Sequence, residues 1–136
     1  SIHLSRGIKI DTCALNHPNG AIGYRVNYDD KSACYVTDTE HKINNIDHNI
    51  AALIHETNLL IYDSTFTDAS YLNHKGWGHS TWQEAERLST IANVKNTAVF
   101  HHDPEHDDVM MDAIDKQIKK LNCNLFIARQ GQQITL

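Results

Sequence analysis

The sequence predicts an α/β fold in which helices pack on a mixed β-sheet. Three observations predict it: β-rich runs fill the chain up to residue 37, helix-start signals follow, and short apolar runs alternate with the helical segments. The predicted element order is β-β-β-α-β-α-β-α-β-β, which is typical of a layered α/β domain. The chain has 136 residues and no repeat, low-complexity tract or Pro/Ser-rich linker, so we expect a single domain over residues 1–136.

The N-terminal part predicts a small meander of strands. Residues 7–13 alternate apolar and polar side chains, as a strand with one solvated face does. The turn-forming residues 16–20 predict a loop. Residues 21–28 and 32–37 are β-rich runs separated by Asp29-Asp30-Lys31, which predicts a hairpin.

The middle of the chain predicts two helices and two buried strands. Asp47 is an N-cap for a short helix, and Thr81 with Glu84 forms a capping box for the second helix. We expect the first of these helices to bury Ile50, Leu53 and Ile54. Residues 58–62 and 94–101 predict strands, with a long loop over residues 63–79 between the first of them and the second helix.

The C-terminal part predicts a last helix and two closing strands. Asp107 or Asp108 begins the helix, and strands at 123–129 and 132–136 follow, with a turn at Gly131. The residues that we expect on the inward face of this helix are Val109, Met110, Ile114, Ile118 and Leu121.

Charge and composition exclude some functions. Twelve Lys and Arg against 17 Asp and Glu give a net charge of −5, which argues against a general nucleic-acid binder. No apolar run approaches the roughly 18 residues of a membrane span, so we expect no membrane partner. Cys13, Cys34 and Cys123 form no disulfide framework and predict buried, reduced thiols. Without an N-terminal signal segment, we expect a cytoplasmic protein.

Polar residues collect where the predicted strands end. Helical crossovers make the strands at 32–37, 58–62 and 94–101 parallel, and the first strand shares their direction. The residues at or just past these carboxyl ends, or ahead of the helix that leaves the same edge, are His17, Asp38, Asp63, His79 and His101. Imidazole and carboxylate ligands suit zinc, manganese or iron, and an aspartate can bridge two ions. We therefore expect a metal-dependent active site at this edge.

Each of these residues also has an ordinary structural explanation. His17 can be a loop residue, Asp38 and Asp63 can be turn residues, and His79 can simply precede a helix. One of His101 and His102 must point away from any site, because successive strand residues face opposite sides. Trp77, between two glycines, either anchors its loop or stacks on a substrate. The prediction therefore depends on several residues lying together.

Five segments resemble the metallo-β-lactamase superfamily, and within it the phosphodiesterase-like and ribonuclease Z-like branch. The segments, which agree with the family in order and spacing, are residues 16–25, 35–39, 59–66, 78–85 and 99–104. The resemblance implies two divalent metal ions, zinc first with manganese or iron as alternatives. The resemblance also implies the metal ligands: His17, Asp38 and His101 match ligand positions of the family, and Asp38 matches the aspartate that bridges the two ions. An ungapped alignment favours His101 over His102.

The resemblance also implies a proton donor. His79 matches the histidine that protonates the leaving group, and Asp63 stands where ribonuclease Z-like members carry a glutamate that orients it. The family's His-x-His-x-Asp-His motif is absent, so the chain resembles the C-terminal half of the family's αββα sandwich: a mixed sheet with helices on its outer face. Strand residues such as Ile8, Ile10, Leu60 and Val99 cannot all be covered by three helices. We expect the N-terminal half of the fold, or a second copy, to cover the open face.

These implications favour a metal-dependent hydrolase that cleaves a small-molecule or nucleotide phosphodiester. A ribonuclease Z-like endonuclease acting on transfer RNA precursors is the alternative, with the acidic charge against it. A third interpretation is a catalytically empty metal-binding or interaction module, because the missing motif supplies most of the remaining ligands.

Overall fold

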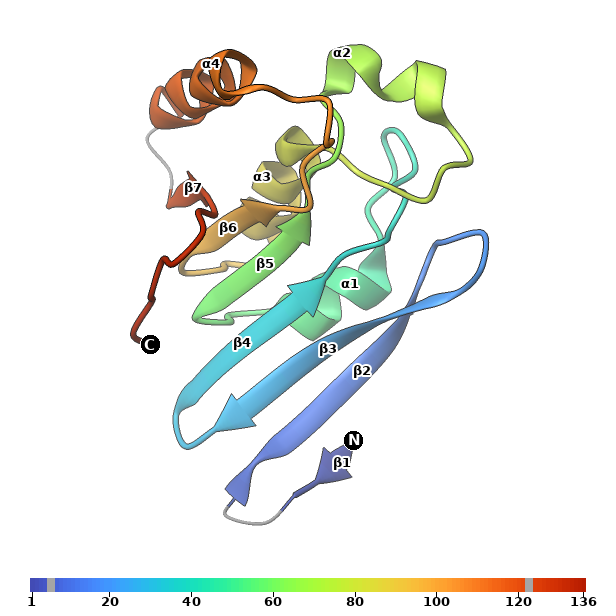
Figure 1. Cartoon of the computed structure of the whole chain (residues 1–136). Helices are drawn as coiled ribbons and strands as arrows, with labels where there is room; N and C mark the ends of the chain where they lie inside the picture. Colours follow the sequence, from blue (N-terminus) through green and yellow to red (C-terminus); the bar gives the residue numbers. More distant parts are fainter. Residues whose placement is uncertain (5–6, 122–123) are drawn as a thin grey trace.

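The computed structural model describes residues 1–4, 7–121 and 124–136, and its centre is one seven-stranded sheet (Figure 1). The strands are β1 (Ile2–His3), β2 (Lys9–Leu15), β3 (Ala21–Tyr28), β4 (Lys31–Val36), β5 (Leu59–Asp63), β6 (Thr97–Phe100) and β7 (Leu125–Ile127). The helices are α1 (His48–Ile54), α2 (Asp68–Tyr71), the 3₁₀ turn η2 (Leu72–His74), α3 (Trp82–Ile91) and α4 (Asp108–Lys119). The predicted α/β class and the mixed sheet are confirmed.

The strand directions place five carboxyl ends, those of β2 and of β4 to β7, at one edge of the sheet. The strands β1 to β4 pair antiparallel in chain order, and β4 to β7 pair parallel. The strand β2 therefore runs in the same direction as β4, β5 and β6. The predicted gathering of strand ends is confirmed, and the segments that follow them lie together at this edge.

Helices cover only one face of the sheet. The helix α1 contacts β2, β3 and β4, α3 contacts β5 and β6, and both lie behind the sheet in Figure 1. Leu60, Tyr62 and Val99 point into this layer and are fully buried, as expected for strands that carry helices. Ile50, Leu53 and Ile54 of α1 are buried as predicted, and Asp47 caps the helix through the amides of Asn49 and Ile50.

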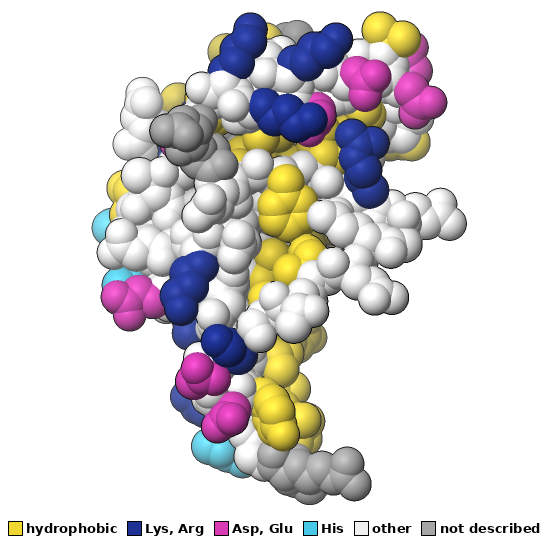
Figure 2. Space-filling model, turned by 90° about the vertical axis from the view of Figure 1, so that its left-hand side faces the viewer, with side chains coloured by type: hydrophobic (Ala, Val, Ile, Leu, Met, Phe, Trp, Pro, Cys, Tyr) yellow, Lys and Arg dark blue, Asp and Glu magenta, His cyan; other side chains and the backbone are white. Residues whose placement is uncertain are grey.

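The other face of the sheet is apolar and open. Along β3, Ile22, Tyr24, Val26 and Tyr28 alternate with residues that face α1, and each is at least 40% exposed. Tyr35 continues this face on β4, opposite Tyr24. Figure 2 shows hydrophobic side chains in a band along the side away from the helices. Leu60 and Val99 are not among them, because they face the helical layer.

Several local predictions were wrong. The stretch 63–79 is not one loop but contains α2 and η2, and the short strand β1 was not predicted. Residues 132–136 form no strand, and the helix α4 buries Ile114 and Ile118 while Val109, Met110 and Leu121 stay exposed. The reason is that α4 packs mainly on β7, so only the stripe of the helix that carries Ile114 and Ile118 is covered.

Two cysteines are free thiols, Cys34 buried and Cys13 half-buried, whereas Cys123 lies outside the described residues. Within the part of the chain that the structure describes, no helix is both long and apolar enough to cross a membrane.

Candidate active site at the strand ends

A buried carboxylate occupies the centre of the site. Asp63 ends β5 and is fully buried. Its Oδ2 accepts a hydrogen bond from the backbone N–H of Asp38 at 2.8 Å, and its Oδ1 accepts one from that of Ser80 at 3.2 Å. The Thr65 hydroxyl donates to Oδ1 at 2.9 Å. Asp63 thereby connects the ends of β4 and β5 to the segment that leads into α3.

Two histidines also contact this carboxylate. His79 Nδ1 lies 3.0 Å from Asp63 Oδ2, and His101 Nδ1 lies 3.4 Å from the same atom. Burial would raise the pKa of Asp63, but hydrogen bonds from His101 and His79 and from the Ser80 N–H lower it to about 2. The bond to Asp63 in turn raises the pKa of His101. With Nδ1 held by the carboxylate, Nε2 of each ring is left for a ligand or a proton.

Two site residues have a left-handed backbone. Asp38 and His101, each just after a strand, both have φ of 59°. Residues other than glycine adopt this conformation rarely, and it concentrates at functional sites. At both positions it turns the chain where the strand ends, and the side chains of Asp38 and His101 lie together with that of His79. Nothing in the one-dimensional pattern of the sequence indicates it.

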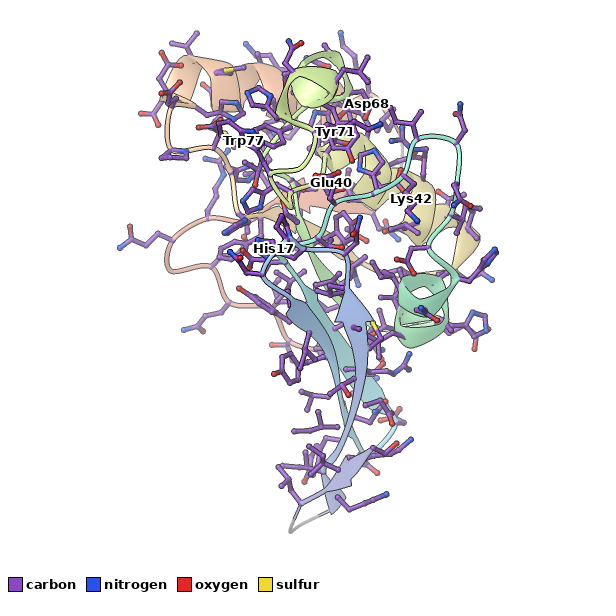
Figure 3. All side chains as sticks on the ribbon, turned by 90° about the vertical axis from the view of Figure 1, so that its right-hand side faces the viewer. His17, Glu40, Lys42, Asp68, Tyr71 and Trp77 are labelled. Carbon is purple, nitrogen blue, oxygen red and sulfur yellow. The ribbon has the colours of Figure 1, made fainter. Side chains whose placement is uncertain are left out.

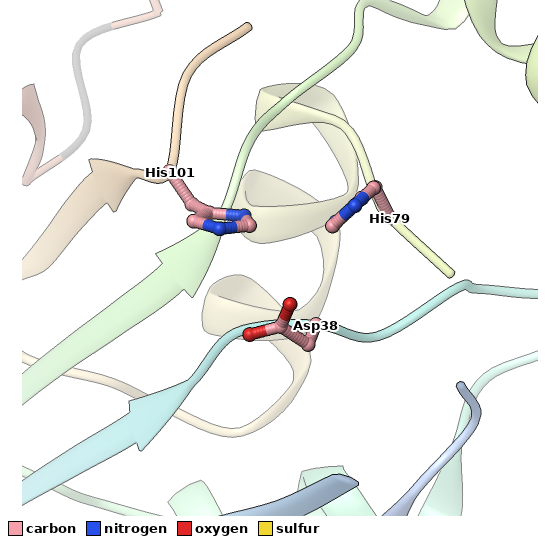
Figure 4. Close-up of side chains that lie close together, drawn as sticks. All are labelled: Asp38, His79 and His101. Atoms are coloured by element: carbon pink, nitrogen blue, oxygen red, sulfur yellow. The ribbon is translucent and has the colours of Figure 1, made fainter. Parts of the chain in front are cut away.

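Three side chains lie close enough to hold a metal ion. One ligand atom each from Asp38, His79 and His101 lie within 4.8 Å of one another (Figure 4). Because ligands sit about 2 Å from zinc, small side-chain rotations would bring all three to one ion. Two imidazoles and a carboxylate form a donor set that suits zinc, manganese or iron. The residues present therefore fit a divalent transition metal.

His17 lies beside this group but outside it. Its ring centroid is 6.1 Å from that of His79, and its Nδ1 accepts a hydrogen bond from the Asn19 N–H at 3.2 Å. Gly78 lies directly against the ring, since a Cβ at that position would come within 2.2 Å of His17 Cδ2. All five predicted site residues thus lie at one sheet edge, with His79 rather than His17 completing the tight group.

His101 and His102 have different surroundings. His101 faces Asp63 and Asp38, whereas His102 is outside this group and both of its ring nitrogens are buried without a hydrogen-bond partner. Burial lowers the pKa of His102. Of the two, His101 is therefore the one that lies in the group of candidate ligands, and its role as a ligand stays a prediction.

A buried hydrogen-bond network, which no sequence pattern indicates, lies behind the site. The Ser80 hydroxyl lies 2.8 Å from His41 Nδ1 and 3.2 Å from the Tyr62 hydroxyl. Tyr71 stacks on His41 with ring centroids 4.1 Å apart, and its hydroxyl donates to the His41 carbonyl. This network fixes Ser80, whose N–H binds Asp63, and so positions His79. His41, three residues after Asp38, carries no pattern that would have identified it.

The arrangement can hold a proton close to the metal-binding group. The fixed anionic Asp63 accepts a hydrogen bond from Nδ1 of His79, which fixes the orientation of the ring. A proton on Nε2 of His79 could then pass to a group bound near Asp38 and His101. A donor, an acceptor and candidate metal ligands within one hydrogen-bonded group are typical of a hydrolytic active site.

Comparison with known proteins agrees with this fold. The model of the family described as the beta-lactamase superfamily domain matches residues 3–102. Two ribonuclease Z proteins are similar: that of Sulfurisphaera tokodaii, 40% identical over 55 residues, and that of Gemmatimonas aurantiaca, 29% identical over 85 residues. These segments make up 40% and 62% of this chain, but only 18% and 27% of the relatives.

Solved structures show the same fold at low sequence identity. The metallo-β-lactamase fold protein YhfI of Bacillus subtilis superposes with a TM-score of 0.76 and 17% identity over 96% of this chain. The short form of human tRNase Z gives 0.71 and 18% over 98%. A diphosphatase of the PhnP family gives 0.68 and 17% over 99%. This chain covers 50%, 45% and 46% of these proteins, respectively.

The chain belongs to the metallo-β-lactamase superfamily. Within it, the similarity to ribonuclease Z and to the PhnP family supports the ribonuclease Z-like branch. The superfamily and these relatives point to a hydrolase, and the chain spans about half the length of the solved proteins that it matches.

Proposed function

We propose that the chain is the C-terminal portion of a dinuclear metal-dependent hydrolase that cleaves phosphodiesters, either small molecules or nucleotides. The observation that carries the proposal is the pair of Asp63 and His79, joined at 3.0 Å beside the candidate ligands Asp38 and His101. Residues 1–136 act in this proposal as one structural unit, which is the C-terminal part of the superfamily's αββα sandwich. The location is cytoplasmic, where the free thiols of Cys13 and Cys34 would stay reduced.

The proposed metal ligands are His17, Asp38 and His101. Asp38 is suited to bridge two ions because it has two oxygens, and the rings of His17 and His101 lie 6.1 Å and 5.0 Å from that of His79. Zinc is our first choice, with manganese or iron as alternatives. When bound, such ions polarise phosphoryl oxygens and lower the pKa of water. The remaining ligands would come from the N-terminal half of the fold.

In this proposal His79 is the proton donor and Asp63 is its orienting partner. Asp63 holds Nδ1, so that Nε2 carries the proton to the leaving oxygen. The shorter aspartate replaces a glutamate of related proteins, yet its Oδ2 still reaches His79 at 3.0 Å, so the hydrogen bond is made.

A ribonuclease Z-like activity on transfer RNA precursors is the second candidate, supported by the two curated relatives. The net charge of −5 requires that RNA-binding basic residues lie outside this chain. A catalytically empty interaction module is the third candidate.

The test uses the intact protein, with its N-terminal half, treated with chelator and then supplied with Zn²⁺ or Mn²⁺. We expect metal-dependent cleavage of bis(p-nitrophenyl) phosphate and little cleavage of the monoester p-nitrophenyl phosphate. Asp38→Asn should abolish the activity, whereas Asp30→Asn, at an exposed turn remote from the site, should not. Preferential cleavage of a transfer RNA precursor would favour the second candidate. A protein that binds no metal after Zn²⁺ or Mn²⁺ is supplied, and that cleaves none of these substrates, would favour the third candidate.

A further inference from the structure

One large aromatic side chain near the site is exposed. Trp77 lies in the loop between η2 and α3, two residues before His79, and is 62% exposed. The other tryptophan, Trp82, is 5% exposed in the core. A tryptophan that anchors a loop buries its ring as Trp82 does, so anchoring does not explain Trp77.

The backbone around Trp77 is nevertheless held firmly. Glu40 Oε2 accepts hydrogen bonds from the N–H groups of Gly76 at 2.6 Å and Gly78 at 3.2 Å, on either side of the tryptophan. Both glycines have positive φ, 87° and 85°, which L side chains rarely adopt. The loop is therefore built so that its main chain is fixed while the indole remains outside. Figure 3 shows Trp77, Glu40 and His17 together at the loop end of the sheet.

Neighbouring rings connect Trp77 to the candidate proton donor. The indole makes an edge contact with His74, with centroids 5.1 Å apart, and His74 stacks on Phe66 at 4.3 Å. Phe66 in turn makes an edge contact with His79 at 6.1 Å. His74 and Phe66 pack against the indole, while 62% of Trp77 stays exposed.

We propose that the exposed indole of Trp77 is a stacking subsite for a planar aromatic ring of the substrate, which is a nucleobase attached to the sugar next to the scissile phosphodiester. This inference rests on the proposed function and specifies its substrate class as nucleotides. Stacking on an aromatic side chain tolerates any base, because every base has a π-face. The subsite would therefore favour nucleotides over simple diesters without selecting one base.

The first test is binding to the intact protein, followed by indole fluorescence. Thymidine 5′-monophosphate should quench the emission, and deoxyribose 5-phosphate, which lacks the base, should not. Trp77→Phe should remove the base-dependent part of this quenching, because Trp82, the other tryptophan of these 136 residues, is buried. Unchanged quenching in Trp77→Phe, or equal quenching by both ligands, would overturn the inference.

The second test is kinetic and uses two substrates with the same leaving group: the p-nitrophenyl ester of thymidine 5′-phosphate and its analogue without the base. Trp77→Ala should raise KM about tenfold for the first and leave the second unchanged, and Trp77→Phe should restore most of the difference. Leu72→Ala, at another exposed apolar residue just before this loop, is the matched control and should change neither.

The outcomes separate the two proposals. Equal losses with both substrates in Trp77→Ala would show that Trp77 supports the loop or contacts the rest of the protein, and would overturn the stacking subsite alone. Base-dependent quenching by Trp77 in a protein that cleaves neither diester would overturn the proposed function and keep the subsite.

Discussion

Asp63 shows how one residue can organise a site from several segments. It is fully buried, yet its pKa of about 2 keeps it anionic at neutral pH, because three backbone N–H groups, a threonine hydroxyl and two histidines surround it. A buried carboxylate with so many donors costs little in desolvation, and it fixes each donor in return. The candidate ligands are therefore placed before any ion or substrate binds.

The proposed roles of His79 and Asp38 lead to different mutant phenotypes. In the intact protein His79→Ala should lower turnover about 10²–10⁴-fold with metal content unchanged, whereas Asp38→Ala should remove metal. A nitrophenyl diester should be less sensitive to His79→Ala than an alkyl diester, because its leaving oxygen needs little protonation. Elemental analysis of the metal content of each variant, together with the turnover of the nitrophenyl and the alkyl diester, checks this prediction. Metal loss in His79→Ala would instead make His79 a ligand, as its place beside Asp38 and His101 allows.

The buried His41 makes stability depend on pH. Burial lowers its pKa from 6.5 to about 4, so between these values the unfolded chain binds a proton that the folded chain does not. Its contribution to stability is complete above pH 6.5 and is lost as the pH falls towards 4, by about 2 kcal/mol at about pH 5. The free energy of unfolding of the wild type and of His41→Asn can be measured with denaturant at about pH 7.5 and pH 5. It should change less with pH in the variant. Parallel curves would contradict this.

Alanine substitutions at Gly78 and Gly76 test whether the position of His17 matters for the site. Both have positive φ, so alanine at either position costs about 1 kcal/mol of backbone strain. Only at Gly78 would the new methyl group meet another residue, His17 Cδ2 at 2.2 Å, whereas nothing lies within 4 Å at Gly76. We expect both variants to be slightly less stable and only Gly78→Ala to lose activity and metal. Equal activity losses would show that the clash with His17 is not what costs the activity.

At the scale of elements, the helices that could be predicted from the sequence are those that begin at a capping residue. Asp47, Thr81 and Asp107 cap their helices through the expected backbone amides. The capping box at Thr81 is only half formed, because the Glu84 carboxylate binds Arg87 at 2.7 Å instead. The turn α2 and the exposed residues of α4 depend on what packs against them, which no local pattern encodes. The five site residues could be predicted because strand direction alone gathers them, whereas His41 and the left-handed Asp38 and His101 required the structure.

The N-cap of α3 also supports the site, because this helix follows His79 and Ser80. The Thr81 hydroxyl accepts from the Glu84 N–H at 3.1 Å and donates to Asp68 at 2.8 Å. Thr81→Ala should cost about 1 kcal/mol of stability, and Thr81→Ser should cost much less because it keeps the hydroxyl. Thr90→Ala, at an exposed position of the same helix, is the control. Thermal unfolding of the three variants measures the difference, and equal values for serine and alanine would contradict it.

At the scale of the molecule, the open face of the sheet is a large exposed apolar surface. Contiguous apolar patches beyond a few hundred Å² are rare on soluble monomers and mark interfaces. Five large exposed residues on β3 and β4, namely Ile22, Tyr24, Val26, Tyr28 and Tyr35, form such a patch. We propose that the N-terminal half of the fold, or a second copy of the chain, covers it.

The isolated residues 1–136 should therefore self-associate and bind metal weakly. Val26→Lys should shift the sedimentation of the chain towards a monomer, whereas Ile91→Lys, at an exposed isoleucine in the helical layer, should not. A monomeric wild-type chain would overturn this expectation. Two ions retained per chain after dialysis against chelator would show that the N-terminal half is dispensable for metal binding.

The order of strands in the sheet is the same as their order along the chain. No strand has to insert between two that have already paired, so the sheet can grow by adding one strand at a time to an existing edge. The antiparallel pairings of β2 to β4 close short loops, whereas each parallel pairing from β4 to β7 has to wait for a long helical crossover. During synthesis the β2–β4 meander can form before His79 and His101 leave the ribosome. The donors around Asp63 then arrive in the order in which they are translated, and the site is completed only when β6 docks.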